Sequence, residues 1–290
     1  MKFANRINGI LVVNKPKGLT SRDVVNRIQN YLQTKAGHTG TLDPMAQGVL
    51  VLTLGKATKL TEILTSEIKE YEAEVTLGVE TDTLDIEGMV LKQQPVNIHE
   101  KQIKKVLEDF KKTYLQEVPK YSAVKVNGRK LYEYARQGQS VILPKKEVTV
   151  YDLKLLDYKG NKFRFYAKVS KGTYIRSLIR DICENLKTVG TMSALIRLKQ
   201  GKFMLSEAYS LEEIIKGHYE VISIKDALEI PWEIVSDDLK EKILNGQKLE
   251  GPWEKVLFID KEEKELAIYH QDKQQLRMWK MLYENNRKVK

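Results

Sequence analysis

The segment AGHTGTLDPMAQGVLVLTLG, residues 36–55, begins as a turn and ends as a run of apolar residues. Its apolar part, residues 49–54, predicts a buried strand. The only carboxylate of the segment, Asp43, directly precedes Pro44, and proline disfavours helical geometry for the residue before it. A loop fixed at the edge of a buried strand can hold such a side chain in place for chemistry. Because aspartate before proline is also common in turns, these residues alone leave a simple turn and a catalytic loop open.

Apolar patterns elsewhere predict a mixture of strands and helices. A continuous apolar run predicts a buried strand at 9–13, and alternating polarity predicts half-buried strands at 71–77 and 163–169. Helical spacing predicts a helix capped by Ser21, a second at 103–110, and a third over 170–186. The alternating strands favour antiparallel pairing, and no regular strand–helix–strand repeat stands out. We therefore predict an α+β fold: a mixed, largely antiparallel sheet flanked by helices.

The pattern changes near Pro231 to short strands. Residues 236–244 predict a helix, and residues 256–259, 266–269 and 278–282 predict three strands. About 60 residues lie close to the lower limit for an autonomous fold. We predict a main domain at 1–230, which the resemblance given below makes the catalytic domain, and a small β-rich module at 231–290.

The net charge of +10 is unevenly distributed along the 290 residues. Residues 101–205 carry +15 and the remainder carries −5. This asymmetry favours a polyanion-binding face, and nucleic acid is a better candidate than membrane because no amphipathic basic helix stands out. No apolar run approaches the about 18 residues of a membrane span, and no signal-peptide pattern stands at the start. A single cysteine, Cys183, excludes an internal disulfide. We expect a cytoplasmic protein without membrane contact.

Motifs for metals and phosphates are missing from the sequence. The four histidines lie far apart and no second cysteine exists, so we expect neither a metal nor another cofactor. GHTGTLD lacks the Gly-Lys-Ser/Thr ending of a phosphate-binding loop.

The segment GHTGTLDPMAQGVL, residues 37–50, closely resembles the signature of the TruB family of tRNA pseudouridine synthases. Further blocks resemble that family in order and rough spacing: VNKPKGLTS (13–21), YEAEVTLGVETDTLDIEG (71–88), VPKYSAVKVNGRKLYEYARQG (118–138), KGTYIRSLIRDI (171–182) and ALIRLKQGKF (194–203). Val118 departs from the pattern where the family usually has proline, and Ile196 departs where arginine is frequent. NGQKL and the strand pattern after it resemble a PUA-like RNA-binding module.

The resemblance implies the pseudouridine synthase fold and a specific reaction. The enzyme would isomerise uridine 55 in the TΨC loop of tRNA, by base flipping and with an essential aspartate, Asp43. Arg176 would be its cationic partner; it lies in the first turn of its helix, where a positive charge opposes the helix dipole unless a carboxylate approaches. Tyr71 would stack on the flipped base and could also move a proton. His38 would fill the gap left in the RNA stack.

Other residues receive supporting roles from the same resemblance. Lys15 and Tyr174 would support the substrate site, and Leu195 would line it. Asp85, or Asp82 in the same loop, would contact the substrate. Residues 119–147 would form a mobile basic insertion that closes over the T arm of tRNA, and four of its residues would contact the RNA backbone: Lys125, Arg129, Lys130 and Arg136.

Some of these residues could have a purely structural role, and two other functions fit the same scaffold. Tyr71 shares its strand face with apolar residues, so it could be an ordinary core aromatic, and a core position is the default for Leu195. A non-catalytic RNA-binding protein on the same scaffold is a second hypothesis, but binding alone would not need Asp43, Tyr71 and Arg176 together. An RNA-guided synthase for ribosomal RNA is a third, and it would normally need a longer chain with partner-protein surfaces. We expect a monomer with no obligate protein partner.

Overall fold

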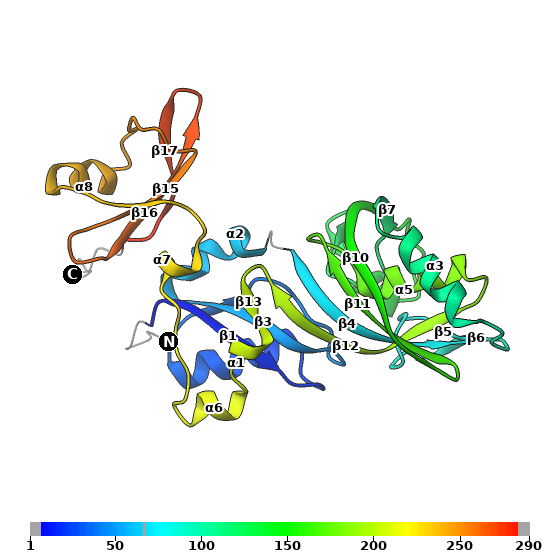
Figure 1. Ribbon diagram of the computed structural model, residues 1–290. Coiled ribbons are helices and arrows are strands. Elements are labelled where there is room, and N and C mark those ends of the chain that lie inside the picture. Colours follow the sequence, from blue (N-terminus) through cyan, green and yellow to red (C-terminus); the bar gives the residue numbers. More distant parts are fainter. Residues whose placement is uncertain (1–6, 66–67, 284–290) are drawn as a thin grey trace.

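The computed structural model describes residues 7–65 and 68–283 (Figure 1). A nine-stranded sheet forms its centre, in the order β1-β3-β12-β4-β11-β10-β7, with β2 beside β3 and β13 beside β12. Only the β3–β12 pair of this sheet is parallel, so the predicted mixed, largely antiparallel sheet is confirmed. Its strands are β1 (Gly9–Lys15), β2 (Ala36–His38), β3 (Gln47–Leu54), β4 (Lys69–Leu77), β7 (Thr113–Glu117), β10 (Lys145–Lys159), β11 (Lys162–Val169), β12 (Gly190–Gln200) and β13 (Phe203–Met204).

Helices and short hairpins surround this sheet. The helices are α1 (Ser21–Leu32), η1 (Gly55–Leu60), α2 (Thr61–Thr65), α3 (Glu100–Asp109), α4 (Leu131–Arg136), α5 (Ile175–Asn185), η2 (Leu205–Glu207), α6 (Leu211–Ile215) and α7 (Ile224–Ala227). Two hairpins pair β5 (Val79–Thr81) with β6 (Val90–Gln93), and β8 (Lys125–Val126) with β9 (Arg129–Lys130). The second hairpin and α4 lie within the predicted insertion at 119–147.

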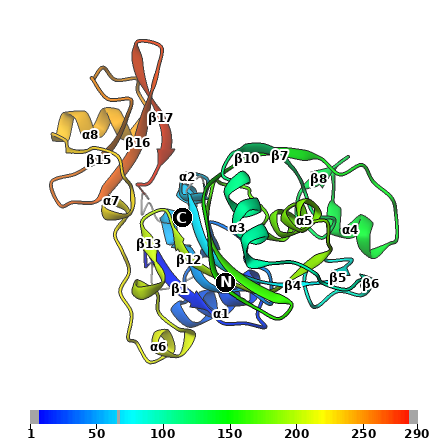
Figure 2. The same cartoon turned by 45° about the vertical axis from the view of Figure 1, so that its right-hand side comes forward.

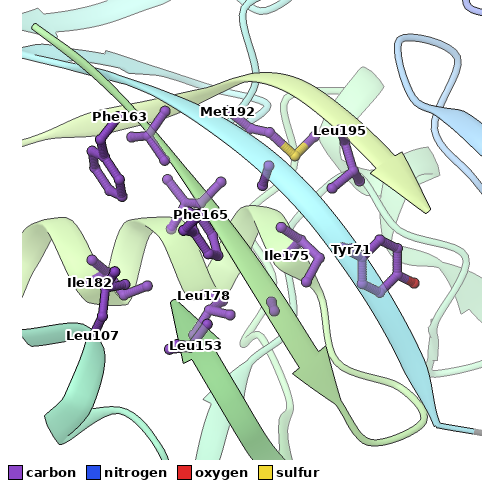
Figure 3. Close-up of a cluster of buried hydrophobic side chains, with 14 of the residues drawn as sticks. Tyr71, Leu107, Leu153, Phe163, Phe165, Ile175, Leu178, Ile182, Met192 and Leu195 are labelled. Carbon is purple, nitrogen blue, oxygen red and sulfur yellow. The ribbon is translucent and has the colours of Figure 1, made fainter. Parts of the chain in front are cut away.

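Two apolar clusters occupy different halves of the sheet. Helices α3 and α5 cover the half made of β4, β11 and β10, whereas α1 and α6 lie at β1 and β3 (Figure 1). In the first half, Phe163 and Phe165 of β11 face Leu178 and Ile182 of α5 (Figure 3). Alternate residues of β4 are buried, as its polarity pattern predicts.

Two helix starts differ from the prediction. Thr20, not Ser21, caps α1, because its extended backbone lets its hydroxyl accept from the Asp23 amide. Ser21 is buried and its hydroxyl bonds the backbone of Leu42 instead. Helix α5 was predicted from residue 170, but it begins at Ile175 because residues 170–173 form a turn.

The C-terminal module has its own four-stranded sheet (Figure 2). It contains β14 (Trp232–Ile234), β15 (Lys255–Ile259), β16 (Glu265–Asp272), β17 (Gln275–Met281) and helix α8 (Asp237–Leu244). The helix and three strands match the prediction, whereas β14 was missed because its three exposed residues are too few to establish an alternating pattern. Apolar side chains of β15 and β16 share one cluster with β1 and β3, and Lys56 pairs with Glu265 at 2.7 Å. The module is therefore fixed against the main sheet, and the boundary at 231 stays a prediction.

Candidate active site

Asp43 lies in the loop 39–46, which joins β2 to β3 and is tied down by its main chain. The Ala46 amide donates to the Asp43 carbonyl at 3.0 Å, and the Gly18 amide donates to the Pro44 carbonyl at 2.8 Å. The Lys15 ammonium donates to the same Pro44 carbonyl at 3.3 Å. These bonds hold the backbone on both sides of the carboxylate, which fixes its position.

Arg197 of β12 ties the two sides of this loop to the sheet. It is 1% exposed, and its guanidinium donates to the carbonyls of Val49 on β3 (2.6 Å) and Gly40 (3.0 Å). At the start of β3, Gly48 has a φ of 104°, and a Cβ there would lie 2.3 Å from the Arg197 carbonyl oxygen. Glycine is required at this point because β3 and β12 approach each other so closely.

Arg176, the second residue of α5, holds the Asp43 carboxylate through two parallel contacts. Its Nε lies 2.9 Å from Oδ2, and its Nη2 donates to Oδ1 at 3.1 Å. The guanidinium also donates to the carbonyls of Thr83 (2.9 Å) and Tyr121 (3.1 Å). The predicted contact between Asp43 and Arg176 is therefore confirmed, and one guanidinium joins three separate segments of the chain.

Burial differs across this ion pair. The Arg176 side chain is 6% exposed, whereas the Asp43 side chain is 32% exposed. A guanidinium held in a fork by a carboxylate and two carbonyls orients the carboxylate as well as balancing its charge. The carboxylate thus keeps one side open for a substrate.

Asp43 lines a cavity of about 510 Å³, a volume typical of sites for small molecules or single bases. Tyr71 of β4 and Leu195 of β12 line it from the sheet, and both lie near Ile175 at the start of α5 (Figure 3). The remaining lining residues come from the Asp43 loop, α2, β4, the insertion, the turn before α5 and its first residues, and β12: Thr39, Gly40, Thr41, Leu42, Thr65, Lys69, Tyr121, Ser122, Ala123, Tyr132, Gly172, Thr173, Tyr174, Arg176 and Arg197.

Comparisons with known proteins agree with this geometry. Residues 28–175 match the family described as TruB family pseudouridylate synthase (N terminal domain). The chain is 45% identical over 244 residues to the tRNA pseudouridine synthase B of Caldanaerobacter subterraneus, which covers 83% of this chain and 86% of that protein. The chain belongs to the TruB family of pseudouridylate synthases. Since pseudouridine synthases are isomerases, it is an enzyme of that class.

Two other relatives give the same result, and one solved structure shares the fold. The tRNA pseudouridine synthase B of Bacillus subtilis is 43% identical over 263 residues, or 85% of this chain and 84% of that protein. That of Geobacillus thermodenitrificans is 42% identical over 288 residues, or 91% of this chain and 94% of that protein. A chain in the crystal structure of a Cbf5-Nop10-Gar1 complex is 23% identical, with a TM-score of 0.71 over 97% of this chain and 85% of that chain. The last likeness shows the fold, and the predicted pseudouridine synthase fold is confirmed.

Five of the predicted site residues of this TruB-family enzyme surround the cavity: Asp43, Tyr71, Arg176, Tyr174 and Leu195. Burial raises the pKa of the Tyr174 hydroxyl, so this side chain stays protonated at neutral pH. The cavity therefore combines a carboxylate, an aliphatic wall and four phenol groups, those of Tyr71, Tyr121, Tyr132 and Tyr174.

Two predicted substrate-binding residues lie behind the cavity lining. Burial lowers the pKa of Lys15 to about 8, although nearby Asp43 opposes that shift, and its ammonium also donates to the Pro16 carbonyl at 2.9 Å. Asp85 lies 3.9 Å from the Arg176 guanidinium and accepts a hydrogen bond from the Thr83 hydroxyl at 2.7 Å. Both residues contact the groups that hold the Asp43–Arg176 pair.

His38 and Asp82 also lie outside the lining residues. His38 ends β2, beside the cavity-lining Thr39, and its Nδ1 finds no hydrogen-bond partner among the described residues. Burial lowers the pKa of His38, and the neighbouring Arg22 adds to this effect, so the neutral imidazole is favoured. Asp82 accepts a hydrogen bond from the Tyr121 hydroxyl at 3.1 Å, which joins its loop to the insertion.

All four predicted RNA-backbone residues lie on the insertion: Lys125, Arg129, Lys130 and Arg136. The ring of Tyr132, which lines the cavity, has Lys130 and Arg136 each 5.4 Å from its centre. Arg129 lies 4.6 Å from the ring centre of Tyr134. The insertion thus covers one side of the cavity with an aromatic ring flanked by positive charge.

Two residues of the site escaped sequence reasoning. Arg197 stands two residues after Leu195 in the same strand, and it therefore lies on the buried face of β12. An arginine in phase with apolar residues was the available signal. Tyr121 contributes a backbone carbonyl, for which side-chain identity gives no signal.

In the described part of the chain, no group of three or more histidine, cysteine, aspartate or glutamate side chains could hold a metal ion. The helices within residues 7–65 and 68–283 include none with the length and apolar character that a membrane-spanning helix needs.

Proposed function

We propose that this enzyme converts uridine 55 in the TΨC loop of tRNA into pseudouridine, with Asp43 as the essential carboxylate. The observation that carries this proposal is the clamped Asp43–Arg176 pair beside a base-sized cavity. Formation of pseudouridine in tRNA is the activity named for its curated relatives. The position within tRNA follows from the family resemblance of residues 37–50.

The reaction is an isomerisation in which atoms are conserved. The N1–C1′ glycosidic bond breaks, the uracil turns, and a C5–C1′ bond forms. The hydrogen on C5 leaves as a proton, and N1 takes up a proton. In our proposal the ionised Asp43 acts as nucleophile or base at these steps, and the Arg176 guanidinium holds its orientation.

A uridine in a folded loop reaches this cavity only after it leaves its stack, at a cost of a few kcal/mol. We propose that Tyr71 and Leu195 hold the flipped base between them, since both line the cavity beside Asp43. An aromatic face contributes about 1–3 kcal/mol for each stacked base. His38, on the strand next to the cavity, would occupy the place that the base has left.

The basic insertion and the C-terminal module would bind the rest of the tRNA. Lys125, Arg129, Lys130 and Arg136 would contact phosphates as the insertion closes over the T arm. In the module, Trp279 has Lys255 and Lys280 at 5.5 and 5.8 Å from its ring centre, a combination that suits a base or ribose–phosphate. We therefore propose 231–290 as an RNA-binding module.

The enzyme would work alone, in the cytoplasm with its tRNA substrate.

Purified enzyme and an unmodified tRNA transcript test the proposal directly. We expect pseudouridine at position 55 of the wild-type transcript and none at that position in a transcript with cytidine 55. Modification at other positions only, or no modification, would contradict the proposed function.

A further inference from the structure

The start of helix α5 carries three cavity-lining residues, Tyr174, Ile175 and Arg176, yet it lacks a cap of its own. Tyr174 is the N-cap residue and makes no side-chain cap bond. In a capping box, a glutamate or glutamine three residues later would accept from the N-cap amide, but Ser177 stands there. Arg176 adds a positive charge, which the helix dipole disfavours at this end. The segment that positions the catalytic pair therefore needs support from elsewhere in the fold.

Gln116 of β7 supplies that support. Its side-chain Oε1 accepts a hydrogen bond from the Tyr174 amide at 2.8 Å. This is the bond that a capping box would make within the helix, made here by a residue 58 positions away in the chain. We propose that Gln116 is a positioning residue for catalysis, which caps α5 across the fold and so fixes Arg176 against Asp43.

A second bond fastens the same two elements. The Ser177 hydroxyl donates to the Glu117 carbonyl at 2.8 Å, one residue along β7 from Gln116. Both residues are buried: Gln116 is 1% exposed and Ser177 is 0% exposed. The first turn of α5 is thus attached to β7 at two successive positions, which restricts sliding and rotation of the helix.

Gln116 is itself held in one orientation. Its Nε2 donates to the Tyr114 hydroxyl at 2.8 Å, and that hydroxyl donates to Asp181 at 3.0 Å. Burial raises the pKa of Tyr114, so the phenol keeps the proton that it donates. Asp181 in turn accepts from the Arg180 guanidinium at 2.8 Å. A connected network of this kind leaves Gln116 no alternative amide orientation that satisfies both its groups.

Strand β7 also leads directly into the insertion. Four residues after Glu117, the carbonyl of Tyr121 accepts from the Arg176 guanidinium at 3.1 Å. The segment from Gln116 to Tyr121 therefore holds the backbone of Tyr174, two residues before Arg176, and also the Arg176 guanidinium. A movement of the insertion as it closes over RNA would therefore be transmitted along β7 to the Asp43–Arg176 pair.

The test compares Gln116→Leu, which removes both bonds, with Gln116→Glu, which is nearly isosteric and keeps an acceptor for the Tyr174 amide. The matched control is Gln94→Leu, because Gln94 bonds Thr188 just beyond the other end of α5. The readouts are the single-turnover rate of pseudouridine formation in tRNA and the Kd for tRNA. Rates are measured well below the melting temperature of each variant.

We expect Gln116→Leu to lower the single-turnover rate about 10- to 100-fold, with Kd changed less than about threefold, because a misplacement within 1 Å has costs of this order. Gln116→Glu should recover most of the rate, and Gln94→Leu should keep it. Should Gln116→Leu not fold, Ser177→Ala is measured instead, with a smaller loss of rate expected at unchanged Kd. A wild-type rate in folded Gln116→Leu would overturn the inference. So would a loss of rate in Gln116→Glu and Gln94→Leu that is as large as the loss in Gln116→Leu.

The inference rests on the proposed function, and the same experiment separates the two. A wild-type enzyme that forms no pseudouridine would defeat the proposed function. A wild-type enzyme that is active, together with equally active Gln116 variants, would defeat the positioning role alone.

Discussion

Replacing Arg176 with lysine tests the role of the guanidinium without removing its charge. Lysine presents one nitrogen in place of the fork, so at most one of the two contacts with Asp43, at 2.9 and 3.1 Å, survives. The shorter reach also endangers the bonds to the Thr83 and Tyr121 carbonyls. The carboxylate would remain beside a cation but would lose its fixed orientation.

The expected size of the effect follows from the lost bond. A hydrogen bond to a charged group contributes about 1.5–3 kcal/mol, and 1.36 kcal/mol corresponds to a tenfold change in rate. If the transition state depends on the orientation of Asp43, Arg176→Lys should lower the single-turnover rate about 10- to 100-fold. Binding of tRNA should change little, since the Arg176 side chain is only 6% exposed and its guanidinium is engaged by Asp43 and two backbone carbonyls.

The assay follows tritium released from tRNA that contains [5-³H]uridine, because C5 loses its hydrogen in the reaction. The matched control is Arg164→Lys, which alters an exposed arginine–carboxylate pair with Glu72. Exposed pairs contribute about 0–1 kcal/mol, so the control should keep the wild-type rate within about threefold. If Arg176→Lys turned over as fast as this control, the fork would not be what positions Asp43.

Three further predictions concern the loop, the insertion and Lys15. Gly48→Ala should lower the free energy of unfolding by about 3 kcal/mol or more, because its Cβ would meet a backbone oxygen at 2.3 Å. The control, Gly18→Ala, has open space around it and should lower it by about 1 kcal/mol. Equal losses of stability in thermal melts would disprove this. Lys125→Ala should weaken tRNA binding and reduce the slope of the log binding constant against log salt concentration by about 0.7–0.9. The control, Lys101→Ala on α3, should leave this slope unchanged. Equal slopes in the two variants would count against phosphate contacts by the insertion. Burial lowers the pKa of Lys15 to about 8 in the folded chain, from 10.5 when unfolded. The free energy of unfolding of the wild type should therefore rise relative to that of Lys15→Met as the pH increases from about 8 to 10.5. A difference between the two proteins that stays constant over this pH range in urea titrations would refute it.

The sequence predicted the elements with a clear apolar period. Strands β1, β3, β4 and β11 and helices α1, α3 and α5 all form in the predicted stretches, although α5 begins five residues later than predicted. The capping residue of α1 was assigned to Ser21 because serine and threonine have similar preferences there, and only the bond of Ser21 to Leu42 decides between them. Strand β14 was missed because its pairing with β15, and not its own polarity, makes it a strand.

The site was predicted less completely than the fold. Motif resemblance brought Asp43 and Arg176 together, a contact between residues 133 positions apart that no local pattern contains. Arg197 and Gln116 were missed. A polar residue at a buried position of a strand must have a hydrogen-bond partner, but the sequence does not show which carbonyl or amide that partner is. The resemblance predicted Lys15 and Asp85 near the site. In the structure, Lys15 donates to the Pro44 carbonyl, and Asp85 lies 3.9 Å from the Arg176 guanidinium.

The most direct test of the account is the activity of Asp43→Asn. Asparagine has nearly the same shape but no negative charge, so the variant should bind tRNA with a Kd within about threefold of the wild type. Pseudouridine at position 55 should fall by about 1,000-fold or more in single-turnover assays, as expected for loss of a reacting group. The control is Asp157→Asn, an exposed residue of β10, which should keep full activity. Ordinary formation of pseudouridine by a folded Asp43→Asn variant would contradict the central claim that Asp43 is the reacting carboxylate.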